Sequence, residues 1–597
     1  MPWRPRQHPG CTDSLEEAMI DSPETMSEGL ITATACSDGL EIPSERPGSQ
    51  RLDAAALAAL AVATLAGCGG GNGSGAEDKA SPPKVGGEPG GGSSPPTVGQ
   101  EPPRPVELVP RSDEDGVRFL LQAQFSASPE QVASVRAKGY RGWLQQEFDA
   151  PRSPPTYGGA IDSAVWGQLI GASDAVRMRL AFALSEVFVV SANGMTEPAN
   201  QLMTGYWDLL VDGVTANFRT LLEDITLNPA MGAYLNTKGN LKEDANGRQP
   251  DENYAREVMQ LFTIGLTALN PDGSPKLDAD GKPMANYTQD DIVNLARVFT
   301  GYNFNSALAD WPRRPMIVNE ANHSKLEAKF LGVTVPANTP SAAALKIALD
   351  ALYQHPNVGP FIGRKLIQRL TTSNPSKAYV QRVSEAFANN GAGVRGDMRA
   401  VFSAILLDPE ARDASGLSNP TYGRLREPIV RVVQWARTFG LTSPQNKWEL
   451  GDLTERIGQS PLRAPTVFNF FTPDHVPSNS GAAARGLVAP EFQIIDESTI
   501  PDYQSYMVSR VSSPLETGSP PPAYTEEMRV VLDAKALVRR LNLLLASGQI
   551  SAETLSVMVR ALEQSALTAE SAEAGKLNRI YAAVLMIMSA PEYLIQK

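Results

Sequence analysis

The stretch Ser173–Ser191, SDAVRMRLAFALSEVFVVS, decides the fold class of this chain. It begins with a residue type that caps helix N-termini, and its apolar side chains recur every three or four positions. Such spacing places a broad apolar stripe along one side of a helix. The stretch therefore predicts an amphipathic α-helix that packs against other helices.

The same helical pattern continues through most of the chain. Further helices are predicted over 218–227, 342–353, 356–370, 377–389, 397–407, 423–439, 528–545, 552–567 and 572–589. Strands do not alternate with these helices, which argues against a parallel α/β sheet, and no fixed-period repeat is evident. The sequence predicts a mainly α protein: a large, multi-helix, bundle-like domain over 113–597, with 485–597 as a candidate C-terminal helical subdomain.

One polar segment interrupts the helices. Leu269–Met284, LNPDGSPKLDADGKPM, contains two Asp-Gly pairs among prolines. Asp-Gly supplies the positive φ of tight turns, so a small β-hairpin insertion is predicted near 269–286. Asp278-Ala-Asp-Gly281 resembles the start of an EF-hand loop, but Lys276 occupies the first ligand position and no Glu occupies the twelfth. Calcium binding is therefore not predicted.

The N-terminal part indicates export. Residues 1–50 are polar and aperiodic, and are predicted to be disordered or to precede the true start. Within 51–68, the run AAALAALAVATLAG leads to Cys68, and its end, Leu65-Ala-Gly-Cys68, resembles the lipobox of bacterial lipoproteins, in which the Cys is lipidated. A small Ala-rich helix is the alternative. Signal peptides begin a chain, so we interpret the printed start as too early.

Residues 69–112 follow as a predicted flexible tether. The stretch 69–105 contains 11 Gly and 8 Pro, a composition that cannot bury a core. A tether after a lipidated Cys68 would hold the helical domain away from a membrane. The sequence thus predicts an exported lipoprotein, anchored at the cell envelope, on its periplasmic or outer face.

Composition excludes several classes of function. The net charge of −13 is a poor match for nucleic acid, whose binding needs clustered Lys and Arg. With three Cys and four His, the chain has few residues that could bind zinc, and no metal site is predicted. Phosphate-loop, nucleophile-elbow and Cys-x-x-Cys motifs are missing, so no cofactor is predicted either.

The densest polar segment is Asp251–Gly265, DENYAREVMQLFTIG. Helical spacing places Asn253 and Glu257 on a polar face beside an apolar one, and it spaces Glu252 and Arg256 for an ion pair. We take Asn253, Arg256 and Glu257 as candidate binding residues in a groove. Spacing alone favours the other interpretation, a capped amphipathic helix with a polar rim.

Three more residues are candidates for catalysis. Thr288 followed by Asp291 is typical of a capping box, and both Asp290 and Asp291 suit the positive end of a helix dipole, so a structural role is favoured over a catalytic one. His323 is a candidate base or metal ligand. A lone His is more often a hydrogen-bonded structural residue.

Several segments together resemble a known bacterial family. Asp251–Gly265 is similar to the Asn-Glu-Asn-Phe-Ala-Arg-Glu-Leu-Met-Glu-Leu-Phe-Thr-Leu-Gly signature of the domain-of-unknown-function family 1800. Further blocks fit in order: Asn228–Met231, Tyr234–Asn236, the Asp-Gly segment, Tyr287–Tyr302, His323 with Lys329–Gly332, His355-Pro356 with Gly363–Leu366, Pro465–Phe471 and Ala489–Gln493. The chain departs from the family pattern at Asp251, Tyr254 and Ser324, and the last removes a carboxylate beside His323.

The resemblance covers roughly 113–597 and implies a secreted, largely helical protein with a secreted sulfatase-like protein as a partner. It implies no activity. Two functions are therefore kept. The first is a binding or assembly protein at the cell envelope, attached to the membrane by its lipid anchor. The alternative is an extracellular polymer hydrolase that uses Glu257 with Asp290 or Asp291 in an inter-helix groove, a chemistry that needs two carboxylates ~5–10 Å apart.

Mass spectrometry of the protein purified from its native source tests the lipoprotein prediction. We expect the mature chain to begin at an acylated Cys68, because the lipobox cysteine becomes the first residue. A Cys68→Ser variant is the control and should lose the acyl mass. Detection of any peptide from residues 1–50 in the mature protein would contradict this prediction.

Overall fold

A computed structural model describes residues 109–156, 159–196 and 198–597. The predictions for 1–50, for 51–68 with Cys68, and for all of the tether except its last four residues lie outside the described residues. Within the described part, no helix is both long enough and apolar enough to cross a membrane.

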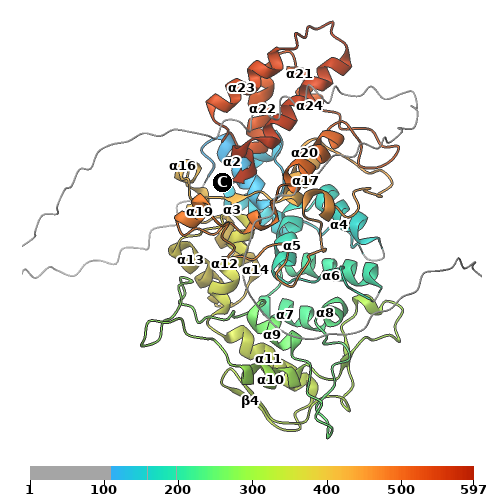
Figure 1. The fold of residues 1–597 in the computed structure, drawn as a ribbon, viewed down its shortest axis with the longest axis vertical. Helices are drawn as coiled ribbons and strands as arrows, with labels where there is room; N and C mark the ends of the chain where they lie inside the picture. Colours follow the sequence, from blue (N-terminus) through green and yellow to red (C-terminus); the bar gives the residue numbers. More distant parts are fainter. Residues whose placement is uncertain (1–108, 157–158, 197) are drawn as a thin grey trace, which may run out of the picture. The chain divides into compact units, whose positions relative to one another are not determined.

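The described residues form 24 α-helices and two 3-10 helices (Figure 1). The first helices in chain order are α2 Asp113–Ala123, α3 Pro129–Asp149, α4 Ile161–Gly171, α5 Ala175–Val187, α6 Ala199–Gly213, α7 Phe218–Leu227, α8 Pro229–Tyr234, α9 Asn253–Gln260, α10 Gln289–Val298, η1 Trp311–Arg313, α11 Ser341–Gln354, α12 Val358–Leu370 and α13 Lys377–Ala388. The remaining helices are α14 Met398–Leu406, α15 Pro409–Arg412, α16 Ser415–Ser418, α17 Pro428–Thr438, α18 Thr454–Ile457, α19 Gly481–Ala484, η2 Pro490–Ile494, α20 Thr499–Arg510, α21 Thr525–Val530, α22 Ala534–Ala546, α23 Ala552–Glu563, α24 Glu573–Ser589 and α25 Pro591–Leu594.

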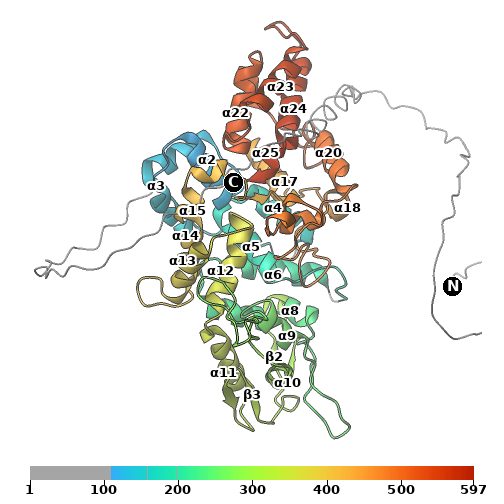
Figure 2. The same ribbon diagram turned by 60° about the vertical axis from the view of Figure 1, so that its left-hand side comes forward.

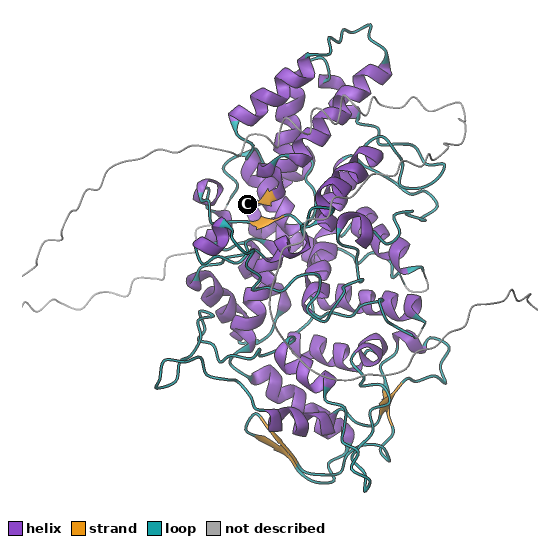
Figure 3. Cartoon of the chain, viewed as in Figure 1, coloured by secondary structure: helices purple, strands orange, loops and turns teal. Residues whose placement is uncertain are grey.

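Strands are few and short in the described part (Figure 3). They make three two-stranded antiparallel pairs: β1 Tyr302–Asn303 with β2 Ile317–Val318, β3 Ala328–Phe330 with β4 Val333–Val335, and β5 Arg424–Leu425 with β6 Ile595–Gln596. The mainly α fold predicted from the sequence is confirmed.

Helix α5 is central to the packing. It contacts α2, α3, α4, α6 and α12, and it lies beside α12 both in Figure 1 and in Figure 2. Twelve of its thirteen residues are buried. The sequence predicted one buried stripe along Ser173–Ser191, but the helix is buried on nearly every side. The buried set includes three charged residues, Arg177, Arg179 and Glu186.

Most predicted helices are found where expected, and two are corrected. The five predicted between residues 218 and 407 appear as α7 and α11–α14 with bounds within two residues. The start of the predicted helix 423–439 is instead strand β5, because Arg424 and Leu425 pair with the C-terminal strand. The predicted helix 528–545 is divided into α21 and α22, because Asp533 caps a new helix by accepting from the Ala536 N–H.

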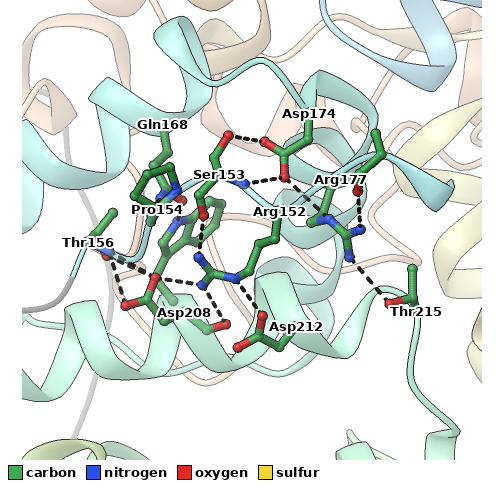
Figure 4. Close-up of polar contacts among 12 residues, drawn as sticks. Arg152, Ser153, Pro154, Thr156, Gln168, Asp174, Arg177, Asp208, Asp212 and Thr215 are labelled. Carbon is green, nitrogen blue, oxygen red and sulfur yellow. Dashed lines mark hydrogen bonds and ion pairs between the residues drawn. The ribbon is translucent and has the colours of Figure 1, made fainter. Parts of the chain in front are cut away.

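A network of ion pairs and hydrogen bonds holds the segment before α4 against the core (Figure 4). Arg152 forms ion pairs with Asp208 at 2.9 Å and Asp212 at 2.5 Å. Asp174 accepts from both the N–H and the hydroxyl of Ser153, and it pairs with Arg177. These charged groups face one another, so we assign this network a structural role.

The Asp-Gly segment is more regular than the predicted hairpin. Its glycines Gly273 and Gly281 have the predicted positive φ, and Gly265 adds a third at the same eight-residue spacing. The backbone closes a ring in which Lys276 N–H donates to Ala268 O, Met284 N–H to Lys276 O, and Ala268 N–H to Met284 O. Residues 265–286 thus form three similar arms, joined by isolated bridges. We call them the three-arm unit, an eight-residue repeat that the sequence analysis missed.

Two buried or half-buried amides hold the three-arm unit against the helices. Asn357, at the start of α12, donates to Ile264 O at 2.9 Å and Thr267 O at 2.7 Å, and accepts from the Leu269 N–H at 2.8 Å. Asn286 donates to the backbone carbonyls of residues 264, 265 and 267. The position of the unit on α12 therefore depends on side-chain amides.

Replacing Asn357 by Ala should lower the free energy of unfolding by about 1–3 kcal/mol, because the change removes three hydrogen bonds and leaves the Leu269 N–H without its acceptor. Chemical denaturation measures this loss. Asn246→Ala, at an exposed Asn, is the matched control and should change stability by less than about 0.5 kcal/mol. Equal losses in the two variants would contradict the anchoring role of Asn357.

Candidate functional site

The predicted polar face of α9 lies partly at the protein surface. Arg256 forms the predicted ion pair with Glu252, at 2.9 Å, and approaches Gln289 on α10. Asn253 is half-buried, and its backbone N–H donates to Asp251. Asn253 and Arg256 therefore lie on a polar rim, the interpretation that their spacing favoured.

Glu257 differs from its neighbours because it is buried, with 7% of its surface exposed. Burial raises the pKa of its carboxyl group, while Arg256 and Lys365 oppose that shift. Its Oε2 atom has no hydrogen-bond partner among the described residues. Of the three predicted binding residues, Glu257 is the one whose carboxyl group interacts electrostatically with the Lys365 amine.

Asp291 caps α10, as predicted. Its Oδ2 accepts from the Thr288 N–H at 2.7 Å and its Oδ1 from the Leu331 N–H at 2.8 Å. Burial alone would raise the pKa of Asp291, but these hydrogen bonds bring it below its ordinary value. Asp290 is exposed in the same first turn. The geometry favours the structural interpretation of both residues.

His323 is buried and contacts Thr300, whose carbonyl lies 3.1 Å and whose hydroxyl lies 3.3 Å from its Nδ1. Burial lowers its pKa. The neighbouring Ser324 donates to Glu243 instead of supplying a carboxylate itself. These contacts favour a structural role, and His323 does not line the cleft described next.

A cleft of about 550 Å³ opens between α12, the three-arm unit and the loop 467–474. Its lining is mostly apolar, from the ends of α5 and α9, the inward side of the three-arm unit, and Phe361 and Phe468. One face of α12 supplies the polar side chains at helical spacing: Arg364, Lys365, Gln368 and Arg369. Gly265 permits the close approach, since a Cβ there would lie 2.4 Å from the Phe361 ring.

Lys365 is the most unusual group in the cleft. It is half-buried, its Nζ donates to Leu261 O at 2.8 Å, and it lies 4.5 Å from the centroid of the Phe361 ring. Burial, with Arg369 nearby, lowers its pKa to about 7 against the pull of Glu257 and Asp474. No carboxylate of the described residues lies within ion-pairing distance.

A cluster of buried charges lies behind the cleft. Arg424 contacts Glu427 and lies 2.9 Å from Glu491, while its guanidinium also donates to Arg369 O. The Arg369 guanidinium in turn lies 3.9 Å from Glu186, which lines the cleft. We call these five residues the buried charge cluster. It joins α5, α12, β5, α17 and η2.

Glu186 and Glu427 form a carboxylic acid–carboxylate pair within this cluster. Burial and the charge of Glu427 raise the pKa of Glu186 well above its ordinary value. Burial opposes ionisation of Glu427 too, but Arg424 and other donors bring its pKa to about 2. No N–H or hydroxyl group of the described residues donates to Glu186. The raised pKa of Glu186 and the lowered pKa of Glu427 favour a protonated Glu186 beside an ionised Glu427.

The residues of the cleft and of the buried charge cluster all lie in the part of the chain that matches a known family. A family model described as a protein of unknown function, DUF1800, matches residues 118–595. The chain belongs to the DUF1800 family. No curated protein and no solved structure matches it. Family membership therefore supplies no activity, and the lipoprotein and export predictions gain no support from it.

Four of the segments by which the sequence resembles DUF1800 proteins meet at the cleft. The end of Asp251–Gly265, the Asp-Gly segment, Gly363–Leu366 and part of Pro465–Phe471 all contribute lining residues. Sequence reasoning missed Arg364 and Lys365, although they lie inside the Gly363–Leu366 block. It also missed Glu186, whose one signal was a charged residue within an otherwise apolar helix.

Matched Glu→Gln variants should separate the two roles within the acid–carboxylate pair. Glu186→Gln replaces one neutral group by another, so we expect a change in stability below about 1 kcal/mol at pH 7. Glu427→Gln leaves Arg424 poorly compensated and should cost about 3–5 kcal/mol. Chemical denaturation measures both, and equal losses would contradict the assignment.

The same variants predict a pH dependence. Glu186 keeps its proton when folded but loses it when unfolded above its ordinary pKa of 4.5, so the folded state binds more protons. The contribution of Glu186 should therefore lower the stability of the native protein as pH rises above about 5. Glu186→Gln should remove that decline, and an unchanged pH profile would contradict the raised pKa.

Proposed function

We propose that this DUF1800 protein is a binding or assembly protein of the cell envelope and that the cleft is its ligand site. The observation that carries the proposal is the column of cations on α12, Arg364, Lys365 and Arg369, within a mostly apolar cleft. Sites of this kind, apolar with a few convergent polar groups, are typical of small-ligand binding.

The charge balance of the cleft favours an anionic ligand group. Against the three cations stand Asp474 and Glu186, and Glu186 is held neutral by burial and by Glu427, which raise its pKa. The rim adds Leu261, Leu266 and other apolar side chains. The ligand that fits best is an anion, such as a carboxylate or sulfate ester, carried on an apolar body.

The cleft has a firm wall for such a ligand. Gln368 donates to Ser373 O and to Pro473 O, each at 3.0 Å, and so ties the loop 467–474 to α12. The Arg369 guanidinium lies 4.3 Å from the centroid of the Phe471 ring. Groups held this way lose little conformational entropy on binding, which supports a preformed site.

The cellular setting remains part of the proposal. Lipidation at Cys68 and the tether would hold the cleft near a membrane, and a secreted sulfatase-like protein is the proposed partner. Leu266, Leu277 and Met284 of the three-arm unit are about half exposed and offer an apolar contact surface beside the cleft. The hydrolase alternative would need a second carboxylate beside Glu257, and Asp291 is engaged in the cap of α10.

Calorimetric titration with octanoate tests the ligand class. We expect octanoate to bind, and octyltrimethylammonium, with the same chain and the opposite charge, not to bind. Lys365→Met should weaken octanoate binding at least about tenfold, because one charge-assisted hydrogen bond is worth about 1.5–3 kcal/mol. Affinity should also fall as pH rises above about 7, since Lys365 loses its charge there.

Arg141→Gln, at an exposed Arg outside the cleft, is the matched control and should bind octanoate like the native protein. Arg364→Gln gives a second cleft variant that leaves the buried charge cluster intact. Equal binding of the cationic and anionic ligands, or unchanged binding by both cleft variants, would contradict the proposed site.

A further inference from the structure

We propose that Lys365 captures its ligand covalently and reversibly, as a Schiff base with an aldehyde or ketone group. This inference rests on the proposed function, because it names the chemical class of the same ligand: an anion with an apolar chain and a carbonyl group. The cleft then binds the anion through its guanidinium groups and the carbonyl carbon through the Lys365 amine.

The surroundings of the Lys365 amine support nucleophilic use. Lys325, Lys329 and Lys346 each have a carboxylate oxygen at 2.5–2.7 Å, which stabilises their charged form. Lys365 has instead a backbone carbonyl, an aromatic ring and the nearby positive charge of Arg369. A lysine becomes a nucleophile when it is removed from water or placed beside another cation; Lys365 is half-buried and lies near Arg369.

The remaining groups of the cleft suit the other parts of such a ligand. Arg364 is adjacent to Lys365 on α12 and Arg369 lies about one turn further along; all three line the cleft, and a guanidinium is the preferred partner of a carboxylate. Glu186 also lines the cleft, and burial together with the charge of Glu427 raises the pKa of its carboxyl group, which favours the protonated form. An acid and an amine therefore line one cleft, and the Arg369 guanidinium lies 3.9 Å from the acid.

The capture step balances without an oxidant, reductant or cofactor. The nitrogen lone pair of neutral Lys365 forms a bond to the carbonyl carbon, and the π pair of the C=O bond moves to oxygen. That oxygen takes protons from the new ammonium group and from Glu186 and leaves as water, while the nitrogen forms the C=N bond. The products are a protonated imine, ionised Glu186 and one water molecule.

Reductive trapping of the full chain tests the inference. We use 2-oxooctanoate, which joins a carboxylate, a ketone and an apolar chain, with cyanoborohydride and peptide mass spectrometry. At pH 7 about half of the Lys365 side chains are free amines, against about one in 2,500 for an ordinary lysine. We expect trapping at Lys365 to exceed that at exposed Lys282 at least about tenfold, and excess octanoate to suppress it.

Variants and pH separate capture from simple binding. Lys365→Arg keeps a cation and should retain some octanoate binding while losing the adduct, and Glu186→Gln should slow trapping. The rate at Lys365 should level off above about pH 8, because its pKa of about 7 leaves its amine almost fully deprotonated there. Octanoate binding without preferential trapping at Lys365 overturns this inference alone. Failure of octanoate to bind overturns the proposed function as well.

Discussion

The contact of Arg424 with Glu427 and Glu491 is the interaction on which the rest of the structure depends. It is fully buried, and it joins the segment that holds Arg424 and Glu427 to the distant Glu491 at the place where β5 meets the C-terminal strand. Charges removed from water are costly unless each has a partner, so the surrounding helices can pack in one arrangement only when this set is complete. The cluster is thus a constraint on packing more than a source of net stability.

The same cluster extends to the cleft. The backbone carbonyl of Arg369 accepts a hydrogen bond from Arg424. Its guanidinium group lines the cleft and lies beside Glu186. Burial and the charge of Glu427 behind it raise the pKa of Glu186. This arrangement explains why a neutral carboxyl group and a column of cations can line one cavity, and it links the rigidity of the core to the chemistry available at the surface.

Local features of the chain were predictable because neighbours in sequence determine them. The capping box of Thr288 and Asp291, the ion pair of Glu252 with Arg256 and the buried face of α9 around Tyr254 all depend on spacings of three or four residues. The positive φ of Gly273 and Gly281 follows from Asp-Gly itself. Helix ends were missed where a distant segment intervened, as at Arg424, which pairs with Gln596.

By itself, the sequence determined the helical fold class, the caps and turns, and the membership in the DUF1800 family. Only the tertiary structure decided which polar residues form a site. Glu186 and Glu427 are separated by 241 positions, and Lys365 faces Leu261 and Glu257 from another helix. Periodicity predicts that such residues are buried or exposed, but a pKa depends on the charges and the solvent around a group. Those are set by contacts between segments that no local pattern specifies.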